Sequence, residues 1–282
     1  MLPPVVDIAW VQQHADEVHL ADGRWYLDGR KGEDAYREGH IPGAVFVDLD
    51  EWLSGGPGAG GGRHPFPDPE VFASGMSQAG ISDGSTVVAY DDQGGVFAAR
   101  LVWMLRALGE SAALLDGGIE SYDGPLEQGD RAVQAGRFTS RPWPPDRLAT
   151  VDDATDAANV VIDARAPSRY QGLEEPLDPR AGHIPGAVNV PCRENLGSDG
   201  KFLPLGELRE RFSAAGVTPE ADVVAYCGSG VTACHNLLAL ELCGFGQARL
   251  YPGSWSEYSS LPGKPVATGP GAGSGPGSGS GS

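Results

Sequence analysis

The sequence predicts an α/β protein of two tandem domains, each a mostly parallel sheet flanked by helices. Three observations lead to this fold class. The chain has 282 residues, which is enough for two domains of ordinary size. Motifs of the first half return in the same order in the second half. Short apolar runs also alternate with helix-like segments, a pattern typical of parallel sheets covered by helices on both faces.

The repeated motifs are specific enough to indicate a tandem duplication. Gly-His-Ile-Pro-Gly occurs once in each half, after Tyr36 and after Tyr170. A short run ending in Asp-x-Arg, interpreted as a strand, precedes each copy, and an apolar run through Ala-Tyr follows it. The paired segments are Trp25–Arg30 with Val160–Arg165, 39–43 with 182–186, and Val87–Asp91 with Val223–Cys227.

Turn signals and composition divide the chain. The strand expected at 86–90 is followed by a helix at 97–108. Gly55 to Gly62 lacks the spacing and strand context of a phosphate-binding loop and is interpreted as a flexible connection. Clustered prolines indicate a semi-rigid linker, and a run of Gly, Ser and Pro indicates disorder. We expect domains at 1–125 and 148–267, a linker at 126–147 and a disordered tail at 268–282.

Composition excludes several classes of partner. The chain has 38 acidic and 20 basic residues, a net charge of −18, which argues against nucleic acids and anionic membranes. It has no apolar run of roughly 18 residues and no secretion signal at its start. The four cysteines form neither a CxxC pair nor a zinc pattern. We expect a soluble cytoplasmic protein with reduced thiols, no metal and no cofactor.

One stretch carries the chemistry. Val223 to Tyr226 is expected to be a buried strand, and a helix is expected from Ala233 to Leu242. Cys227 lies between them, where the unpaired amides and positive dipole end of the helix favour a thiolate. Gly228 and Gly230 let successive amides turn toward the sulfur. We interpret Cys227 as a nucleophile or sulfur carrier, and the other cysteines, Cys192, Cys234 and Cys243, as small buried hydrophobes.

With these motifs, the chain resembles the tandem-domain sulfurtransferases, the rhodanese and 3-mercaptopyruvate sulfurtransferase family. The resemblance covers about residues 5 to 265 and rests on the two Gly-His-Ile-Pro-Gly copies, on 227–233 and on 250–257. It implies two rhodanese-like domains, of which the C-terminal one is catalytic. The first copy accordingly has Asp91 at the position of the cysteine.

The resemblance also implies a reaction in two steps. Cys227 takes a sulfane sulfur from a donor as a persulfide, and then passes it to a thiol or to cyanide. The amides of the loop hold the anionic sulfur. A cysteine phosphatase would need an arginine six positions after the cysteine, where this chain has Ala233. The residues expected to form the anion-binding loop are Gly228, Gly230, Val231 and Thr232.

Further site residues are carried over from the family by position. The loop after Cys227 is uncharged, like that of the mercaptopyruvate enzymes, whereas thiosulfate enzymes place cations there. Arg169 matches a residue that binds the carboxylate of the donor, and Arg180 is a second candidate. Ser229, His64 and Asp50 match a Ser-His-Asp arrangement that assists proton transfer to the pyruvate enolate, which would place the site between the domains.

His40 and His183 occur in both repeats, so we expect them to be structural. Three functions remain open at this point. The first is sulfur transfer from 3-mercaptopyruvate, and the second is thiosulfate:cyanide sulfur transfer with the same fold and nucleophile. The third is a non-enzymatic sulfur relay or persulfide sensor that delivers sulfur to a protein. We expect a monomer, with a small-molecule sulfur donor, a thiol or cyanide acceptor and a thioredoxin-like reductant as partners.

Overall fold

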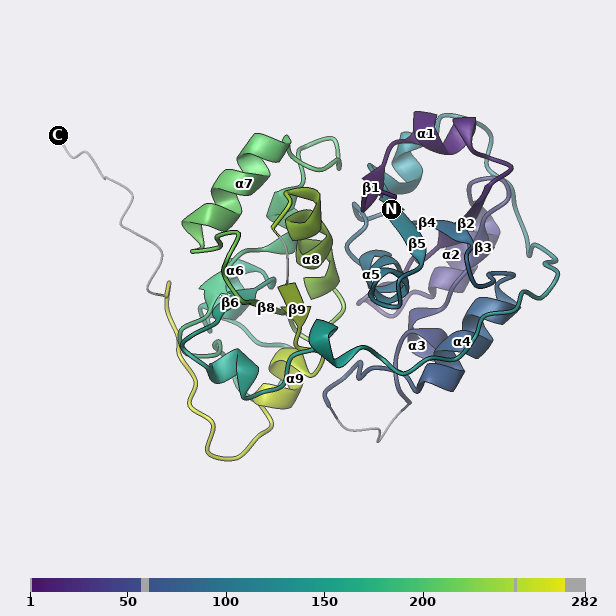
Figure 1. Ribbon diagram of the computed structural model, residues 1–282. Coiled ribbons are helices and arrows are strands. Elements are labelled where there is room, and N and C mark those ends of the chain that lie inside the picture. The colour runs from purple at the N-terminus through teal and green to yellow at the C-terminus, as the bar shows by residue number, and fades with distance from the viewer. Residues whose placement is uncertain (1, 57–60, 246–247, 272–282) are drawn as a thin grey trace.

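The computed structural model describes residues 2–56, 61–245 and 248–271. Two α/β units lie side by side, the first drawn from purple to blue and the second from green to yellow in Figure 1. Residues 57–60 of the predicted flexible connection and 272–282 of the predicted tail lie outside the described residues. The Gly269 N–H donates to the Gln171 carbonyl at 2.9 Å, so the chain is still packed on the second unit where we expected disorder.

Each unit contains one sheet whose paired strands are all parallel. The first has the strand order β1-β5-β4-β2-β3 and the second β7-β6-β8-β9. If β1 is left out and the second order is read in reverse, the two orders correspond strand by strand, β5 with β9, β4 with β8, β2 with β6 and β3 with β7. This confirms the predicted duplication and fold class. The strands are β1 (Val5–Val6), β2 (Val18–Asp22), β3 (Val45–Phe46), β4 (Thr86–Tyr90), β5 (Ser111–Leu115), β6 (Val160–Asp163), β7 (Val188–Asn189), β8 (Val223–Tyr226) and β9 (Ala248–Leu250).

Short helices connect the strands and cover both faces of each sheet. The predicted helix after β8 is confirmed at Ala233–Leu242, and the one after β4 is shorter than predicted. Within the described ranges, no helix is long and apolar enough to cross a bilayer. The helices are α1 (Ile8–Gln13), α2 (Gly32–Glu38), α3 (Leu49–Trp52), α4 (Pro69–Gln78), α5 (Ala99–Ala107), α6 (Pro167–Tyr170), α7 (Leu205–Ala214), α8 (Ala233–Leu242) and α9 (Ser254–Tyr258), with 3-10 turns η1 (Gly118–Ser121), η2 (Pro145–Arg147), η3 (Asp153–Thr155) and η4 (Cys192–Asn195).

The predicted strand at Trp25–Arg30 is wrong. The strand is β2, and its Asp22-Gly-Arg24 is the true counterpart of Asp163-Ala-Arg165. In both copies the arginine pairs with the buried aspartate at 2.7 Å and also donates to the carbonyl of the glycine before His-Ile-Pro. The Asp28–Arg30 pair that we had matched is exposed on the surface, so the buried pair decides where the strand ends.

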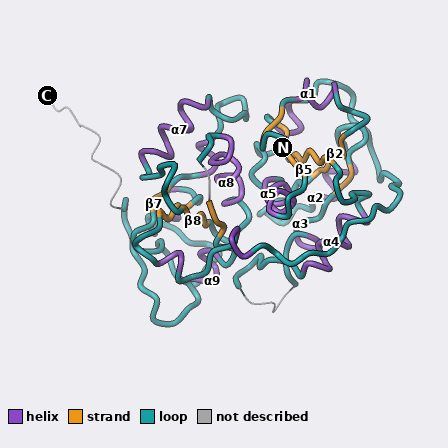
Figure 2. Tube along the Cα trace, in the orientation of Figure 1, coloured by secondary structure: helices purple, strands orange, loops and turns teal. Residues whose placement is uncertain are grey.

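The chain between the units has no regular helix or strand from residue 123 to residue 144. It appears as a loop past α4 in Figure 2. Trp143 donates its indole N–H to the Pro67 carbonyl, and Phe138 packs edge-on against Phe72 of α4. This segment is therefore held against the first unit by specific contacts.

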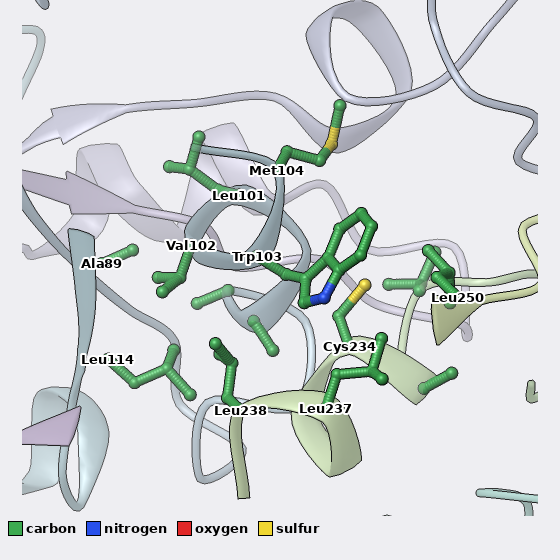
Figure 3. Close-up of a cluster of buried hydrophobic side chains, with 14 of the residues drawn as sticks. Ala89, Leu101, Val102, Trp103, Met104, Leu114, Cys234, Leu237, Leu238 and Leu250 are labelled. Carbon is green, nitrogen blue, oxygen red and sulfur yellow. The ribbon is translucent and has the colours of Figure 1, made fainter. Parts of the chain in front are cut away.

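The two units share one hydrophobic core. Helix α5 of the first unit packs against α8 of the second. Trp103 of α5 lies against Cys234 and Leu237 of α8 in Figure 3, and all three side chains are almost fully buried. Burial on this scale stabilises the contact by roughly 25 cal/mol per Å² of apolar surface removed from water. The interface therefore places loops of the first unit firmly beside the β8–α8 loop.

Candidate active site

Cys227 stands at the carboxyl end of β8, in the loop that leads into α8. Its side chain is 2% exposed, and its sulfur accepts the Gly230 N–H at 3.2 Å. Gly230 has φ +77°, and a Cβ atom there would meet the Pro252 carbonyl at 2.5 Å. Only glycine fits this turn. The start of α9 fixes the backbone of Cys227, because the Cys227 N–H donates to the Ser254 hydroxyl and the Cys227 carbonyl accepts from the Trp255 N–H.

The corresponding loop of the first unit shows what this local fold binds. It follows β4 as the cysteine loop follows β8, and its carboxylate from Asp91 is fully buried. Four backbone N–H groups donate to that carboxylate at 2.7 to 3.0 Å. Their donors are Gln93, Gly95, Phe97 and Ala98. The strand–loop–helix unit is thus a cradle for an anion, filled internally in the first copy and offered to sulfur in the second.

Ser229, His64 and Asp50 form the predicted chain of side chains. The Ser229 hydroxyl lies 2.7 Å from His64 Nδ1, and His64 Nε2 lies 3.5 Å from Asp50 Oδ1. Since a carboxylate only accepts, this arrangement assigns the His64 proton to Nε2 and leaves Nδ1 to accept from the serine. His64 holds the pKa of Asp50 below its usual range, and the Trp25 indole N–H at 3.0 Å adds to this.

Two guanidinium groups face the beginning of the cysteine loop. A Cβ atom at Gly228 would lie 2.8 Å from Arg63 Nη2 and 3.3 Å from Arg169 Nη1. Arg169 pairs with Glu175 at 2.6 Å and with Asp178 at 3.2 Å, and Arg63 also pairs with Asp178, at 3.2 Å. Both acids are nearly fully buried. These two carboxylates orient the guanidinium groups of Arg63 and Arg169, and one edge of each guanidinium group faces the cysteine loop.

These groups line one cavity of about 350 Å³ between the two units. Cys227, Ser229, Val231 and Thr232 contribute from the second unit, and Trp25, Arg63 and His64 from the first. Asp50 stands outside this cavity, behind His64. The structure therefore brings together Cys227, Gly228, Ser229, Val231, Thr232, His64 and Arg169, with Asp50 in contact through His64 and Gly230 directly beneath the sulfur.

Arg180 does not belong to this group, and its predicted role in donor binding is wrong. Its guanidinium donates to the backbone carbonyls of Tyr258, Ser259, Leu261 and Lys264, and so fastens the chain after α9. Arg63 is the residue that sequence reasoning missed. The signal was its position directly before His64, because a residue that adjoins a site histidine on a short loop is carried to the same cavity.

The paired histidines make the same contacts in both copies, in keeping with the structural role expected for them. His40 stacks on Tyr36 and His183 on Tyr170, and each Nδ1 lies within hydrogen-bond distance of the tyrosine backbone carbonyl. All four cysteines are free and buried. Cys192 lies in the cavity wall beside Cys227, whereas Cys234 belongs to the hydrophobic core. Burial raises the pKa of the Cys192 and Cys234 thiols to about 12, so both are neutral thiols at pH 7.

Fold and site together define a two-domain α/β protein with a cysteine in an anion-binding loop at the domain interface. The rhodanese-like domain family matches residues 7–124 and 147–261, and the chain belongs to this family. It is 47% identical over 264 residues to a probable 3-mercaptopyruvate sulfurtransferase of Pseudomonas aeruginosa, covering 89% of this chain and 92% of the relative. It is 40% identical over 277 residues to the putative thiosulfate sulfurtransferase SseB of Mycobacterium tuberculosis, covering 95% and 97%.

Solved structures agree on the fold. The crystal structure of SseA from Escherichia coli, a 3-mercaptopyruvate sulfurtransferase, superposes with a TM-score of 0.79 at 34% identity, over 90% of this chain and 100% of that one. The 3-mercaptopyruvate sulfurtransferase from Leishmania major superposes with a TM-score of 0.83 at 31% identity, over 94% and 76%. Membership of this family implies a transferase that uses a sulfur donor and a sulfur acceptor.

Proposed function

We propose that this protein transfers sulfane sulfur from 3-mercaptopyruvate, through a persulfide on Cys227, to a thiol or cyanide. The observation that carries the proposal is the convergence of Arg63, Arg169 and the Ser229–His64 pair on the cavity of Cys227. In this proposal residues 148–267 form the catalytic domain. Residues 1–125 supply His64, Asp50 and Arg63.

The first half-reaction makes the persulfide. The Cys227 thiol passes its proton through Ser229 to His64 Nδ1, and Asp50 stabilises the imidazolium. The thiolate attacks the donor sulfur, forming an S–S bond. The donor C–S bond breaks, and its electron pair leaves as the pyruvate enolate. His64 then returns the proton through Ser229 to the enolate carbon. The products are the Cys227 persulfide and pyruvate, with no outside oxidant or reductant.

The second half-reaction transfers the sulfur from Cys227 to the acceptor. A thiolate or cyanide attacks the outer sulfur of the persulfide, and the S–S bond breaks toward Cys227. The loop amides and the positive end of α8 stabilise the sulfur that leaves as thiolate. A thioredoxin-like reductant is the protein acceptor that we propose, acting on the protein as a monomer.

Charge favours the keto acid over thiosulfate. Arg63, Arg165 and Arg169 are balanced by Asp163, Glu175 and Asp178, so the cluster has no net formal charge. A second negative charge on the donor would therefore find no unpaired cation within this cluster. Mercaptopyruvate has one carboxylate, which can accept hydrogen bonds from the edges of Arg63 and Arg169 that face the cavity. It also has a carbonyl group that the Ser229 hydroxyl can polarise.

The alternative with the same nucleophile is a thiosulfate:cyanide sulfurtransferase, favoured by the similarity to SseB. Steady-state transfer to cyanide separates the two, with each donor compared on wild type, Cys227→Ser and Cys192→Ser. We expect a preference of at least tenfold for mercaptopyruvate, no activity in C227S and retained activity in C192S, which alters another thiol of the cavity wall. A preference for thiosulfate would overturn the donor assignment.

The third function, a non-enzymatic relay, predicts negligible turnover with both donors. In that case Cys227 would still gain one sulfur atom from a protein persulfide, detectable by mass spectrometry of its peptide. Turnover of either small donor that depends on Cys227 contradicts the relay.

A further inference from the structure

Arg100 is a buried cation that forms no ion pair with a carboxylate of the described residues. It lies on α5 of the first unit, and its side chain is fully buried. The buried arginines Arg24, Arg106 and Arg165 each pair with a carboxylate, whereas Arg100 forms no such pair with the described residues. A guanidinium keeps its charge in a protein interior. Since an uncompensated buried charge is costly, its surroundings must supply negative potential by other means.

The guanidinium is held by backbone carbonyls from both units. It donates to Leu53 at 3.0 and 3.2 Å, to His64 at 3.1 Å and to Gly230 at 2.8 Å. It also stacks on the Phe66 ring at 4.5 Å. One group thus joins the segment that carries His64 to the loop that carries Cys227.

The contact with Gly230 brings the charge of Arg100 to the loop that surrounds the sulfur. The Gly230 carbonyl belongs to the peptide whose N–H is that of Val231, and a cation on the carbonyl makes that N–H a stronger donor. The Gly230 N–H itself donates to the Cys227 sulfur. Burial lowers the pKa of Arg100, and the nearby sulfurs of Cys234 and Cys227 act in the opposite direction, which places the guanidinium close to both thiols.

We propose that Arg100 is a positioning residue whose charge, delivered through Gly230 from the first domain, stabilises the anionic sulfur of Cys227. The proposal rests on the proposed function only in taking Cys227 as the reacting thiolate. The second unit places no lysine or arginine in the loop itself. The first domain, whose own loop has Asp91 in place of a cysteine, then supplies a cation that helps to make the cysteine of its neighbour reactive.

Other groups around the sulfur also influence its protonation, and they are unchanged in the variants below. They include cations on both sides of the cavity, the His64 imidazole, two further thiols and one rim carboxylate. By element they are Arg63 and His64 from the first unit, Arg165 before α6 and Arg169 on it, Cys192, Arg193 and Glu194 on η4, and Cys234 on α8.

Arg106 is the matched control. It lies on the same helix, is nearly buried and also crosses to the second unit, where it pairs with Glu241 of α8. It makes no contact with the cysteine loop among the described residues. Loss of a buried interdomain arginine is common to Arg100→Gln and Arg106→Gln, so an effect found only in the first reports on the loop.

The test measures alkylation of Cys227 by iodoacetamide as a function of pH, by mass spectrometry of its peptide, on protein shown to be folded by circular dichroism. We expect R100Q to raise the pH midpoint of alkylation by about one unit, because the thiolate loses the stabilising cation; at any pH well below both midpoints this is about tenfold less thiolate. Arg100→Lys keeps the charge, so its midpoint should stay within about 0.3 units of wild type, and R106Q should match wild type.

Two results would overturn the proposal. One is a wild-type midpoint in R100Q. The other is a midpoint in R100K that is raised by as much as one unit, because a positive charge at this position would then not be sufficient to stabilise the thiolate. This second result decides the question even if R100Q does not fold. No sulfur donor is used, so the test stands even if mercaptopyruvate is not the donor.

Discussion

Arg63 provides the sharpest test of the donor site. Its side chain is 29% exposed and faces Gly228, and its removal leaves Asp178 paired with Arg169. Arg63→Gln therefore deletes one charged donor without leaving a buried acid alone. A hydrogen bond to a charged group contributes about 1.5 to 3 kcal/mol, and partial exposure places Arg63 at the lower end. About 1.4 kcal/mol corresponds to tenfold, so we expect KM for mercaptopyruvate to rise about tenfold with little change in kcat.

The assay is pyruvate formation at saturating acceptor, with mercaptopyruvate varied. Arg193→Gln is the control, because Arg193 lines the same cavity but is exposed and donates to Gln93 at 2.8 Å. We expect less than a twofold change in that variant. An unchanged KM in R63Q, or an equal rise in R193Q, would refute specific recognition by Arg63. Arg169→Gln is less clean, since it removes the closer partner of the buried Glu175.

Three further predictions concern proton transfer and stability. His64→Gln should lower kcat with mercaptopyruvate by about 10²-fold, and since the pKa of Asp50 is held below its usual range, no loss of activity above pH 5 should come from its protonation. Asp91→Asn should lower the free energy of unfolding in urea by about 2 to 4 kcal/mol, because charge-assisted bonds from four amides are weakened and an amide NH₂ faces N–H donors. Burial lowers the pKa of His235 to about 3; its proton binds more tightly in the unfolded chain, so stability should be complete above about pH 6.5 and fall progressively toward pH 3, by up to roughly 4 kcal/mol.

Each of these has a clear contrary outcome. Equal kcat in H64Q and wild type would remove His64 from proton transfer. An unfolding midpoint in D91N identical to wild type would mean that the amides around Asp91 are satisfied by water. For His235, which stacks on Phe202, the comparison is His235→Gln, and an unaltered acid branch of its stability curve would assign the acid sensitivity to other groups.

The cysteine loop was predictable because its signals are local. An apolar run, a cysteine, two glycines and a helix follow one another within one stretch, and the structure has β8, the loop and α8 at those positions. The end of the strand at Asp22 could not be predicted, because Asp22-Gly-Arg24 and Asp28-Gly-Arg30 are the same tripeptide. What separates them is burial and a bond from Arg24 to the distant Gly39 carbonyl, and no local pattern reports either.

The arginines show the same limit at the site. Arg169 was proposed because it stands at a family position, and the structure has it on α6 in the wall of the cavity. Arg180 was placed in the site and Arg63 was overlooked because an arginine's function depends on which acceptors its guanidinium group contacts. Arg180 meets four backbone carbonyls, whereas Arg63 meets one carboxylate and open cavity. Long side chains of this kind are assigned by tertiary structure, not by spacing in the sequence.

The first copy has Asp91 where the second has Cys227, yet the first copy still helps to form the cavity around that cysteine. Both loops are built to surround an anion, and in the first an internal carboxylate from Asp91 fills it permanently. As in the second copy, the helix that follows this loop is buried against the other domain. That helix is α5, which carries Arg100 to Gly230 and Trp103 into the shared core. The first copy thereby contributes a fixed contact to the cysteine loop, through which we propose that its charge acts on the sulfur of the second copy.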